Sequence, residues 1–220
     1  LLLLDHECSV VNEMSMPFKA EDIAFDNGRF YVLTFEHAAK ARIHIMDENL
    51  QQIEEFDLEG SKFTAGTSLE VADGKIFVTH NAADDLMSVT NLETRDTTVL
   101  VDLKDAAPRG IAAVGRVTVA LDSTLNTAYL YYGGGLLEER EFPKVYFHLA
   151  SRKNQLWGLG IDGEGFFAEK IDIEIPPSGI AGNLLDVNQD NTVDMRDTLT
   201  ELRKPSPSKF IILESIKRWI

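Results

Sequence analysis

The chain has 220 residues, of which 44% are hydrophobic, and it carries a formal net charge of −15. This hydrophobic content is enough for one sizeable core or two small ones. The negative charge opposes binding to nucleic acid and to anionic membrane surfaces, and it favours a divalent metal or a cationic partner. The single cysteine, Cys8, excludes an internal disulfide and a thiolate metal cluster.

The N-terminal residues are apolar. Leu1 to Leu4 precede Asp5, and this run is too short for a signal-peptide core or a membrane span, so it predicts a strand. No other apolar run approaches transmembrane length, and we therefore expect no membrane span. The abrupt apolar start suggests an excised or processed piece of a longer chain.

A pattern of strand, turn glycine, basic residue and strand then occurs three times. Its copies are Glu21–Val32, Thr67–Val78 and Arg109–Val119. The turn glycines Gly28, Gly74 and Gly115 are 46 and 41 residues apart, close to the roughly 40 to 50 residues of one propeller blade. In the first two copies the Asn-Gly or Asp-Gly dipeptide between apolar runs is a strong hairpin signal.

Further strands are expected after each repeated hairpin. In the first two units they cover residues 41–46, 52–58, 87–92 and 97–103. A third unit covers residues 108–142. A degenerate fourth covers 145–175, with strands near 146–150, 155–161 and 166–173. Pro177–Ala181 echoes Pro108–Ala112, which suggests the start of a partial fifth unit. Four strands per unit correspond to one blade of a propeller.

This pattern resembles the NHL and YncE-like β-propeller repeats over residues 17 to 182. The resemblance implies an all-β fold, a β-propeller-like array of about four four-stranded blades plus a partial one. The alternative is a β-sandwich with evenly spaced strands. The sequence leaves ring closure open: either residues 1–11 add a closing strand to a small ring, or the chain is part of a larger ring.

Residues 186–197 have the spacing of an EF-hand calcium loop. Oxygen-bearing side chains occupy loop positions 1, 3, 5, 9 and 12, and a backbone carbonyl fills position 7. The expected ligands are Asp186, Asn188, Asp190, the Thr192 carbonyl, Asp194 and Asp197. Two departures from the usual pattern are Asn191 in place of glycine and an aspartate at the last position. The alternative interpretation is an acidic surface loop.

The residues on either side of this loop indicate which family of calcium loops it resembles. Residues 182–185 read as extended, and residues 195–204 read as a short α-helix ended by Pro205. This arrangement resembles a single dockerin repeat, and the alternative is the calcium loop of integrin-type (FG-GAP) propeller blades. No second dockerin repeat follows, so cohesin binding is not implied. The resulting division is 1–181 propeller-like domain, 182–204 calcium loop and helix, and 205–220 linker and apolar tail.

The tail from Lys209 to Ile220 has a broad apolar helical face. We expect it to dock on the body of the protein, and membrane or partner anchoring is the alternative.

No nucleophile elbow, phosphate-binding loop or paired metal histidines occur in the sequence. His37 and His80 end second-strand candidates and could face a rim or channel, but we interpret them as solvated loop histidines. Glu21-Asp22 and Asp84-Asp85 lie where propeller lactonases place metal ligands, and we interpret them as charged loops. Trp157 is expected to be an aromatic core residue rather than a sugar-stacking one.

The sequence therefore predicts an extracellular or cell-surface calcium-binding β-propeller of prokaryotic origin, acting as a binding or structural module with structural calcium. The location follows because such loops saturate where calcium is plentiful, and the origin fits the lack of an Asn-x-Ser/Thr sequon. The partner would be a protein or glycan, or other copies of the chain. Enzymatic activity is not expected. The alternatives are a metal-dependent propeller hydrolase of lactonase or esterase type, and a subunit of a surface layer or filament.

Overall fold

The structure is a computed structural model, and every regular element in its described part is a β-strand. It divides into two compact units, Leu1–Ile111 and Ala112–Ile220. The described residues are 2–4, 10–13, 15–16, 18–34, 40–81, 85–103, 108–132, 134–152 and 154–173.

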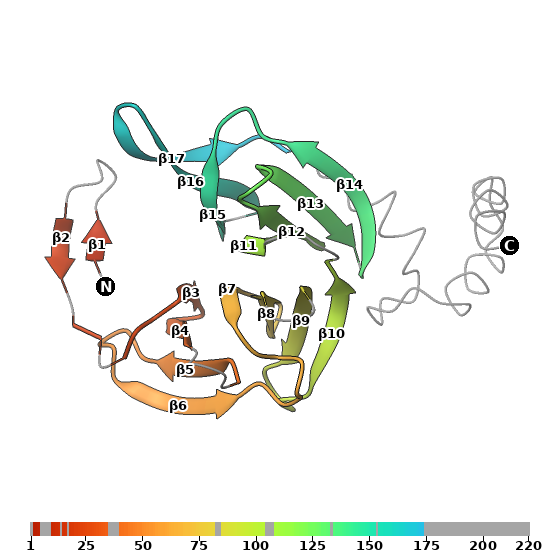
Figure 1. The fold of residues 1–220 in the computed structure, drawn as a ribbon. Coiled ribbons are helices and arrows are strands. Elements are labelled where there is room, and N and C mark those ends of the chain that lie inside the picture. The colour runs from red at the N-terminus through yellow and green to blue at the C-terminus, as the bar shows by residue number, and fades with distance from the viewer. Residues whose placement is uncertain are drawn as a thin grey trace, which may run out of the picture. The chain divides into compact units, whose positions relative to one another are not determined.

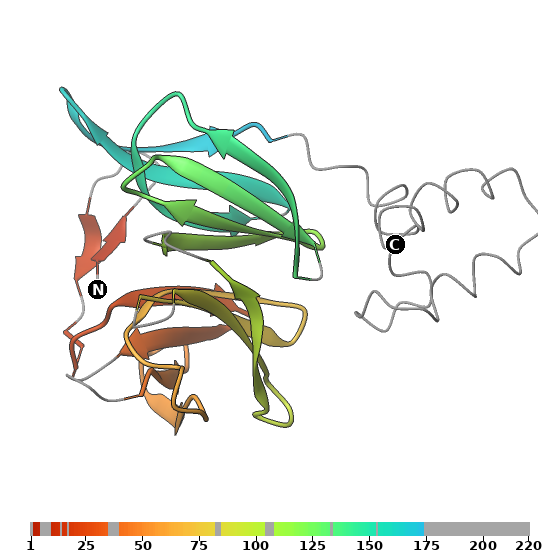
Figure 2. The same cartoon turned by 45° about the vertical axis from the view of Figure 1, so that its right-hand side comes forward.

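The first unit begins with a two-stranded antiparallel pair. Strand β1 (Leu2–Leu4) pairs with β2 (Val10–Glu13), as Figure 2 shows. The predicted N-terminal strand is thus confirmed. Its partner among the described strands is β2 rather than a strand of a blade.

Two four-stranded antiparallel meanders follow in the first unit, each with its strands in sequence order (Figure 1). The first sheet contains β3 (Asp22–Asp26), β4 (Arg29–Thr34), β5 (Arg42–Met46) and β6 (Gln52–Asp57). The second sheet contains β7 (Gly66–Ala72), β8 (Lys75–His80), β9 (Leu86–Asn91) and β10 (Thr97–Asp102).

The second unit repeats the same architecture. Its first sheet contains β11 (Pro108–Val114), which begins in the first unit, β12 (Val117–Asp122), β13 (Thr127–Tyr132) and β14 (Gly135–Glu141). The last sheet has three described strands, β15 (Tyr146–Arg152), β16 (Gln155–Asp162) and β17 (Gly165–Ile171).

Successive meander sheets confirm the predicted all-β fold, a β-propeller-like array of blades, and replace the β-sandwich alternative. A sandwich would distribute neighbouring strands over two facing sheets, whereas here each run of strands forms its own sheet. The partial fifth blade, the calcium-binding helical segment and the apolar tail lie outside the described residues.

The three repeated glycines occupy the first hairpin turn of three successive blades, as predicted. Asn27-Gly28 and Asp73-Gly74 have positive φ at both turn residues, with 48° and 73° in the first turn and 51° and 70° in the second. These are the values of a type I′ turn, which Asn-Gly and Asp-Gly favour. In the third turn Gly115 is the first turn residue, with φ of 60°. The glycine is therefore shifted by one position relative to the other two blades.

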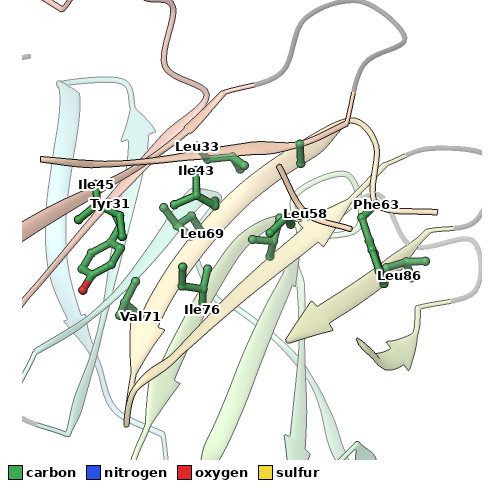
Figure 3. Packing of buried hydrophobic residues seen from close by; sticks show 12 residues of the cluster. Tyr31, Leu33, Ile43, Ile45, Leu58, Phe63, Leu69, Val71, Ile76 and Leu86 are labelled. Atoms are coloured by element: carbon green, nitrogen blue, oxygen red, sulfur yellow. The ribbon is translucent and has the colours of Figure 1, made fainter. Parts of the chain in front are cut away.

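The core of the first unit lies between its two blades (Figure 3). Leu69 and Val71 of β7 join Leu33 and Ile43 of the first sheet in one buried cluster. A Cβ atom added at Gly66 would lie 2.9 Å from Leu33 Cδ1, so β7 approaches the first sheet closely. Burial of such side chains contributes about 1.5–3 kcal/mol each relative to exposure.

The second unit has an equivalent cluster between its two blades. It joins side chains of β11, β12 and β13 to Tyr146, Leu149 and Leu156 of the last sheet. Gly158 is essential to this packing, because an added Cβ would lie 2.4 Å from Tyr146 Cδ1 and 2.6 Å from Ile171 Cδ1.

We expect Gly158→Ala to lower the free energy of unfolding of the second unit by about 1–3 kcal/mol, the usual cost of overpacking a core. Gly163→Ala is the matched control, since nothing lies within 4 Å of an added Cβ there. Urea unfolding of both variants measures the difference. Equal stability of the two variants would contradict this packing of β16 against Tyr146.

Candidate functional site

The predicted calcium ligands lie outside the described residues. Their donor set consists of oxygens alone, the ligand type that calcium prefers, so the chemistry of the sequence fits this ion. Within the described ranges, no group of three or more His, Cys, Asp or Glu side chains could hold a metal. The calcium site therefore stays a prediction.

Asp22 is a structural residue rather than part of a charged loop. It is 8% exposed, and its Oδ2 accepts a hydrogen bond from Leu69 N at 2.6 Å while Oδ1 accepts one from Ile23 N at 2.7 Å. The carboxylate thus ties β3 to β7 of the next blade. Its neighbour Glu21 forms an exposed ion pair with Lys19 at 3.0 Å. The loop interpretation is therefore wrong for Asp22.

A second side-chain hydrogen bond connects strands of different sheets. Thr67 Oγ1 donates a hydrogen bond to the carbonyl of Pro108 at 2.7 Å, which links β7 to β11. Of the second predicted carboxylate pair, Asp84 lies outside the described residues. Asp85 precedes β9, and its carbonyl accepts a hydrogen bond from Leu103 N at 2.8 Å.

His80 is fully buried at the end of β8, so its interpretation as a solvated loop histidine is wrong. Its Nδ1 lies 3.0 Å from the Thr64 carbonyl and its Nε2 lies 2.8 Å from Ser88 Oγ. Because a carbonyl only accepts, Nδ1 carries the proton and Nε2 of the neutral ring accepts from Ser88. Burial lowers the pKa of His80 from 6.5 to about 4, although the Thr64 hydrogen bond acts in the opposite direction. His37 lies outside the described residues.

The first blade has a similar pair of a histidine and a hydroxyl side chain, but its histidine is on the third strand instead of the second. His44 pairs with Val32 and Ser88 pairs with Val78, so both lie at the same position of the third strand, opposite valines 46 residues apart. In the first blade Thr34 Oγ1 lies 3.1 Å from His44 Nε2. Thr34 and His80 are therefore equivalent, as are His44 and Ser88.

Asp122 and Tyr129 occupy these two positions in the third blade. Tyr129 lies opposite Ala120, and Asp122 is the last residue of β12. Burial raises the pKa of Tyr129, and the negative charge of Asp122 adds to this effect. The buried polar pairs of the first two blades thus hold neighbouring strands together, and their geometry indicates structural roles.

We expect the first unit to lose stability as the pH falls from about 6.5 to about 4. The unfolded chain takes up a proton at His80 near the ordinary pKa of 6.5, whereas the folded chain does so only near 4. His80 therefore contributes its full stabilisation above pH 6.5. This contribution falls as the pH drops from 6.5 to about 4, and the total loss is up to about 3 kcal/mol. Urea unfolding between pH 4.5 and 7.5 measures the slope.

His80→Gln removes this titrating group and should flatten that slope. His148→Gln is the control, because it lies in the second unit and leaves the residues of the first unit intact. A slope that survives in His80→Gln would mean that other groups cause it.

The sheet of β15, β16 and β17 has one packed face and one apolar face that is open to solvent. Along β16, Leu156 packs into the core, whereas Leu159 and Ile161 are 36% and 51% exposed. Ile161 lies opposite Phe166, which is 75% exposed. We call this surface the open face, and it consists of the exposed Leu159, Ile161 and Phe166 together with the half-buried Phe147 and Trp157.

Two observations concern the aromatic side chains of the open face. The rings of Phe147 and Phe166 meet edge to face, with 6.1 Å between their centroids. Trp157 lies opposite Ala150 and Lys170, on the side of the sheet away from the core, so its predicted core role is wrong. Its indole Nε1 is buried and has no hydrogen-bond acceptor among the described residues. Buried indole N–H groups usually find a partner.

No family model matches the chain, and no curated protein matches it. It is similar to a solved chain of the nidogen/laminin complex, with a TM-score of 0.53 and 13% identity over 68% of this chain and 61% of that one. It is also similar to the computationally designed Ika4 protein, with a TM-score of 0.46 and 16% identity over 72% and 94%. A third is virginiamycin B lyase from Staphylococcus aureus, with a TM-score of 0.48 and 14% identity over 78% and 62%.

These similarities concern the fold alone. The chain spans 61% and 62% of the nidogen/laminin chain and of the lyase. The fold class is a β-propeller-like array of blades, and the described part of the chain contains no helix long and apolar enough to cross a membrane.

Proposed function

We propose that this chain is a protein-binding module of the β-propeller class, with a calcium ion ordering its C-terminal segment. The observation that supports protein binding is the open face, because contiguous exposed apolar surface on a soluble domain marks interaction sites. Three of its five side chains are aromatic, the residue type enriched at the energetic centre of protein interfaces. A glycan partner is less suited, since the aliphatic Leu159 and Ile161 offer no hydrogen bonds to sugar hydroxyls.

Calcium has a structural role in this proposal. Asp186, Asp190, Asp194 and Asp197 would hold the ion together with Asn188 and the Thr192 carbonyl. Four carboxylates in one loop repel each other, so a bound divalent cation lowers the free energy of the ordered loop. The proposed location is extracellular or at the cell surface, where calcium is plentiful.

The hydrolase alternative is less well supported. It needs carboxylates at strand ends that are available to a metal, and the candidate Asp22 already accepts two backbone hydrogen bonds. Self-assembly into a surface layer or filament would use the same open face, and the experiment below distinguishes it.

We expect a photo-crosslinking amino acid at position 166 to form adducts with one partner protein in the native extracellular fraction. The control is the same amino acid at Glu93, an exposed turn position of the second blade. Adducts at 166 that disappear with Ile161→Lys support the proposal. Equal adducts at both positions would contradict it, and an adduct of twice the chain mass would favour self-assembly.

We expect Asp190→Ala to abolish calcium binding at the loop, because position 5 supplies a direct carboxylate ligand. Titration calorimetry of the full chain measures the affinity. Calcium should also raise the free energy of unfolding, by about 2.7 kcal/mol when free calcium is a hundredfold above the dissociation constant. The melting temperature should rise with it. Unchanged affinity in Asp190→Ala would contradict the calcium site.

A further inference from the structure

The side of the last sheet that carries the open face has only basic side chains among its ionisable residues. Cross-strand neighbours in a sheet lie on the same side, so the register assigns each side chain of β15, β16 and β17 to one side. On the side of Trp157 and Leu159, the ionisable side chains are His148, Arg152 and Lys170.

The acidic residues of these three strands lie on the other side. Glu169 is the cross-strand neighbour of Gly158, on the side that faces the core, and it accepts a hydrogen bond from the Tyr146 hydroxyl at 2.6 Å. Asp162, the last residue of β16, alternates with Ile161 and so also points away from the open face. Positive charge is therefore concentrated on one side of this sheet, although the formal net charge of the chain is −15.

Two of these basic side chains are available to a partner. Lys170 Nζ lies 2.9 Å from Asp172 Oδ1, but the Asp172 side chain is 89% exposed, and an ion pair in contact with water contributes little to stability. Arg152 is exposed and forms no ion pair with another described residue. A carboxylate of a partner can therefore pair with either side chain without breaking a strong contact.

The first blade shows what covers the equivalent side of a sheet in this molecule. Trp157 is the third residue of β16, as Tyr31 is of β4, and each of these is the second strand of its blade. Tyr31 is 4% exposed, because it lies in one cluster with Leu69 and Val71 of β7, as Figure 3 shows. An extended strand with aliphatic side chains two residues apart thus covers this side of the first blade.

An extended segment also fits the spacing of the open face. Side chains on one side of a strand are about 7 Å apart along the chain, so two aliphatic residues separated by one residue match Trp157 and Leu159. Their neighbours Ala150 and Ala168 are exposed and small, which leaves room for approaching side chains. Lys170 lies beside Trp157, so a carboxylate next to such an aliphatic pair comes within reach of a positive charge.

We propose that the open face binds an extended acidic segment of a partner protein, with two aliphatic side chains on Trp157 and Leu159 and carboxylates beside Arg152 and Lys170. This inference rests on the proposed protein binding at the open face and specifies the chemistry of the partner. The net charge of −15 repels an acidic partner at long range. At physiological ionic strength, however, exposed charges more than about 8 Å apart are largely screened, so the local basic side chains decide the pairing.

Fluorescence anisotropy with the full chain at physiological ionic strength tests this proposal. The probe is a labelled peptide of sequence Asp-Glu-Leu-Ser-Val-Glu-Asp, and its control, Asn-Gln-Leu-Ser-Val-Gln-Asn, has the same aliphatic residues without the charges. We expect the acidic peptide to bind about fivefold more tightly or better. Arg152→Gln and Lys170→Gln should each weaken its binding by about two- to fivefold, the range of exposed ion pairs, and leave the binding of the uncharged peptide unchanged.

Lys19→Gln is the matched control, because it removes the same charge from an exposed side chain of the first unit and should leave the affinity unchanged. Equal affinity for the two peptides would overturn the proposal, as would no binding of the acidic peptide or unchanged affinity in both Arg152→Gln and Lys170→Gln. A dimer of the chain alone in sedimentation velocity that dissociates in Ile161→Lys would assign the face to a second copy and would also overturn it.

Crosslinking at position 166 separates this inference from the proposed function. Adducts at 166 without a preference for the acidic peptide would overturn the acidic partner and leave protein binding at the open face intact. The lack of any adduct at 166 would contradict protein binding at this face itself.

Discussion

The packing of one sheet on the next is the interaction on which this structure depends. A four-stranded blade has an apolar face that it cannot cover by itself. In the first unit, β7 supplies Leu69 and Val71 to the surface of the preceding sheet. Arg95, in the connection before β10, also contacts β6, with Nη2 at 2.8 Å from Glu54 Oε2 and its guanidinium 4.7 Å from the centre of the Phe56 ring. The two blades of the first unit therefore depend on each other for stability.

The blades were predictable from the sequence because their strongest signals are local. Asn27-Gly28 and Asp73-Gly74 define type I′ turns by their own conformational preferences. The predicted bounds of the third and fourth strands of the first two blades agree with the structure to within one residue. The third turn was located, but its one-residue shift was not, since Gly115-Arg116 lacks the Asn or Asp that marks the first turn position.

The roles of individual polar residues were less predictable because they depend on contacts distant in the sequence. In the sequence Asp22 resembles a loop carboxylate, because its hydrogen-bond donor, the amide of Leu69, belongs to the next blade. In the sequence His80 resembles a residue at an exposed strand end, because its contacts with Thr64 and Ser88 appear only in the structure. The open face was missed for a related reason: Trp157, Leu159 and Ile161 alternate as core residues do, and the side of a sheet that is buried is decided by its neighbours.

The hydrogen bonds of Asp22 with Leu69 and of Thr67 with Pro108 have a consequence for synthesis on the ribosome. The partner of Asp22 is 47 residues further along the chain, and the partner of Thr67 is 41 residues further. At translation rates of about 5–20 residues per second, each blade waits several seconds for the first strand of the next one. The nascent chain therefore cannot complete its blades independently. It closes them one after another in the order of translation, and a ribosome that stalls between blades leaves Asp22 and Thr67 without the hydrogen bonds that join them to Leu69 and Pro108.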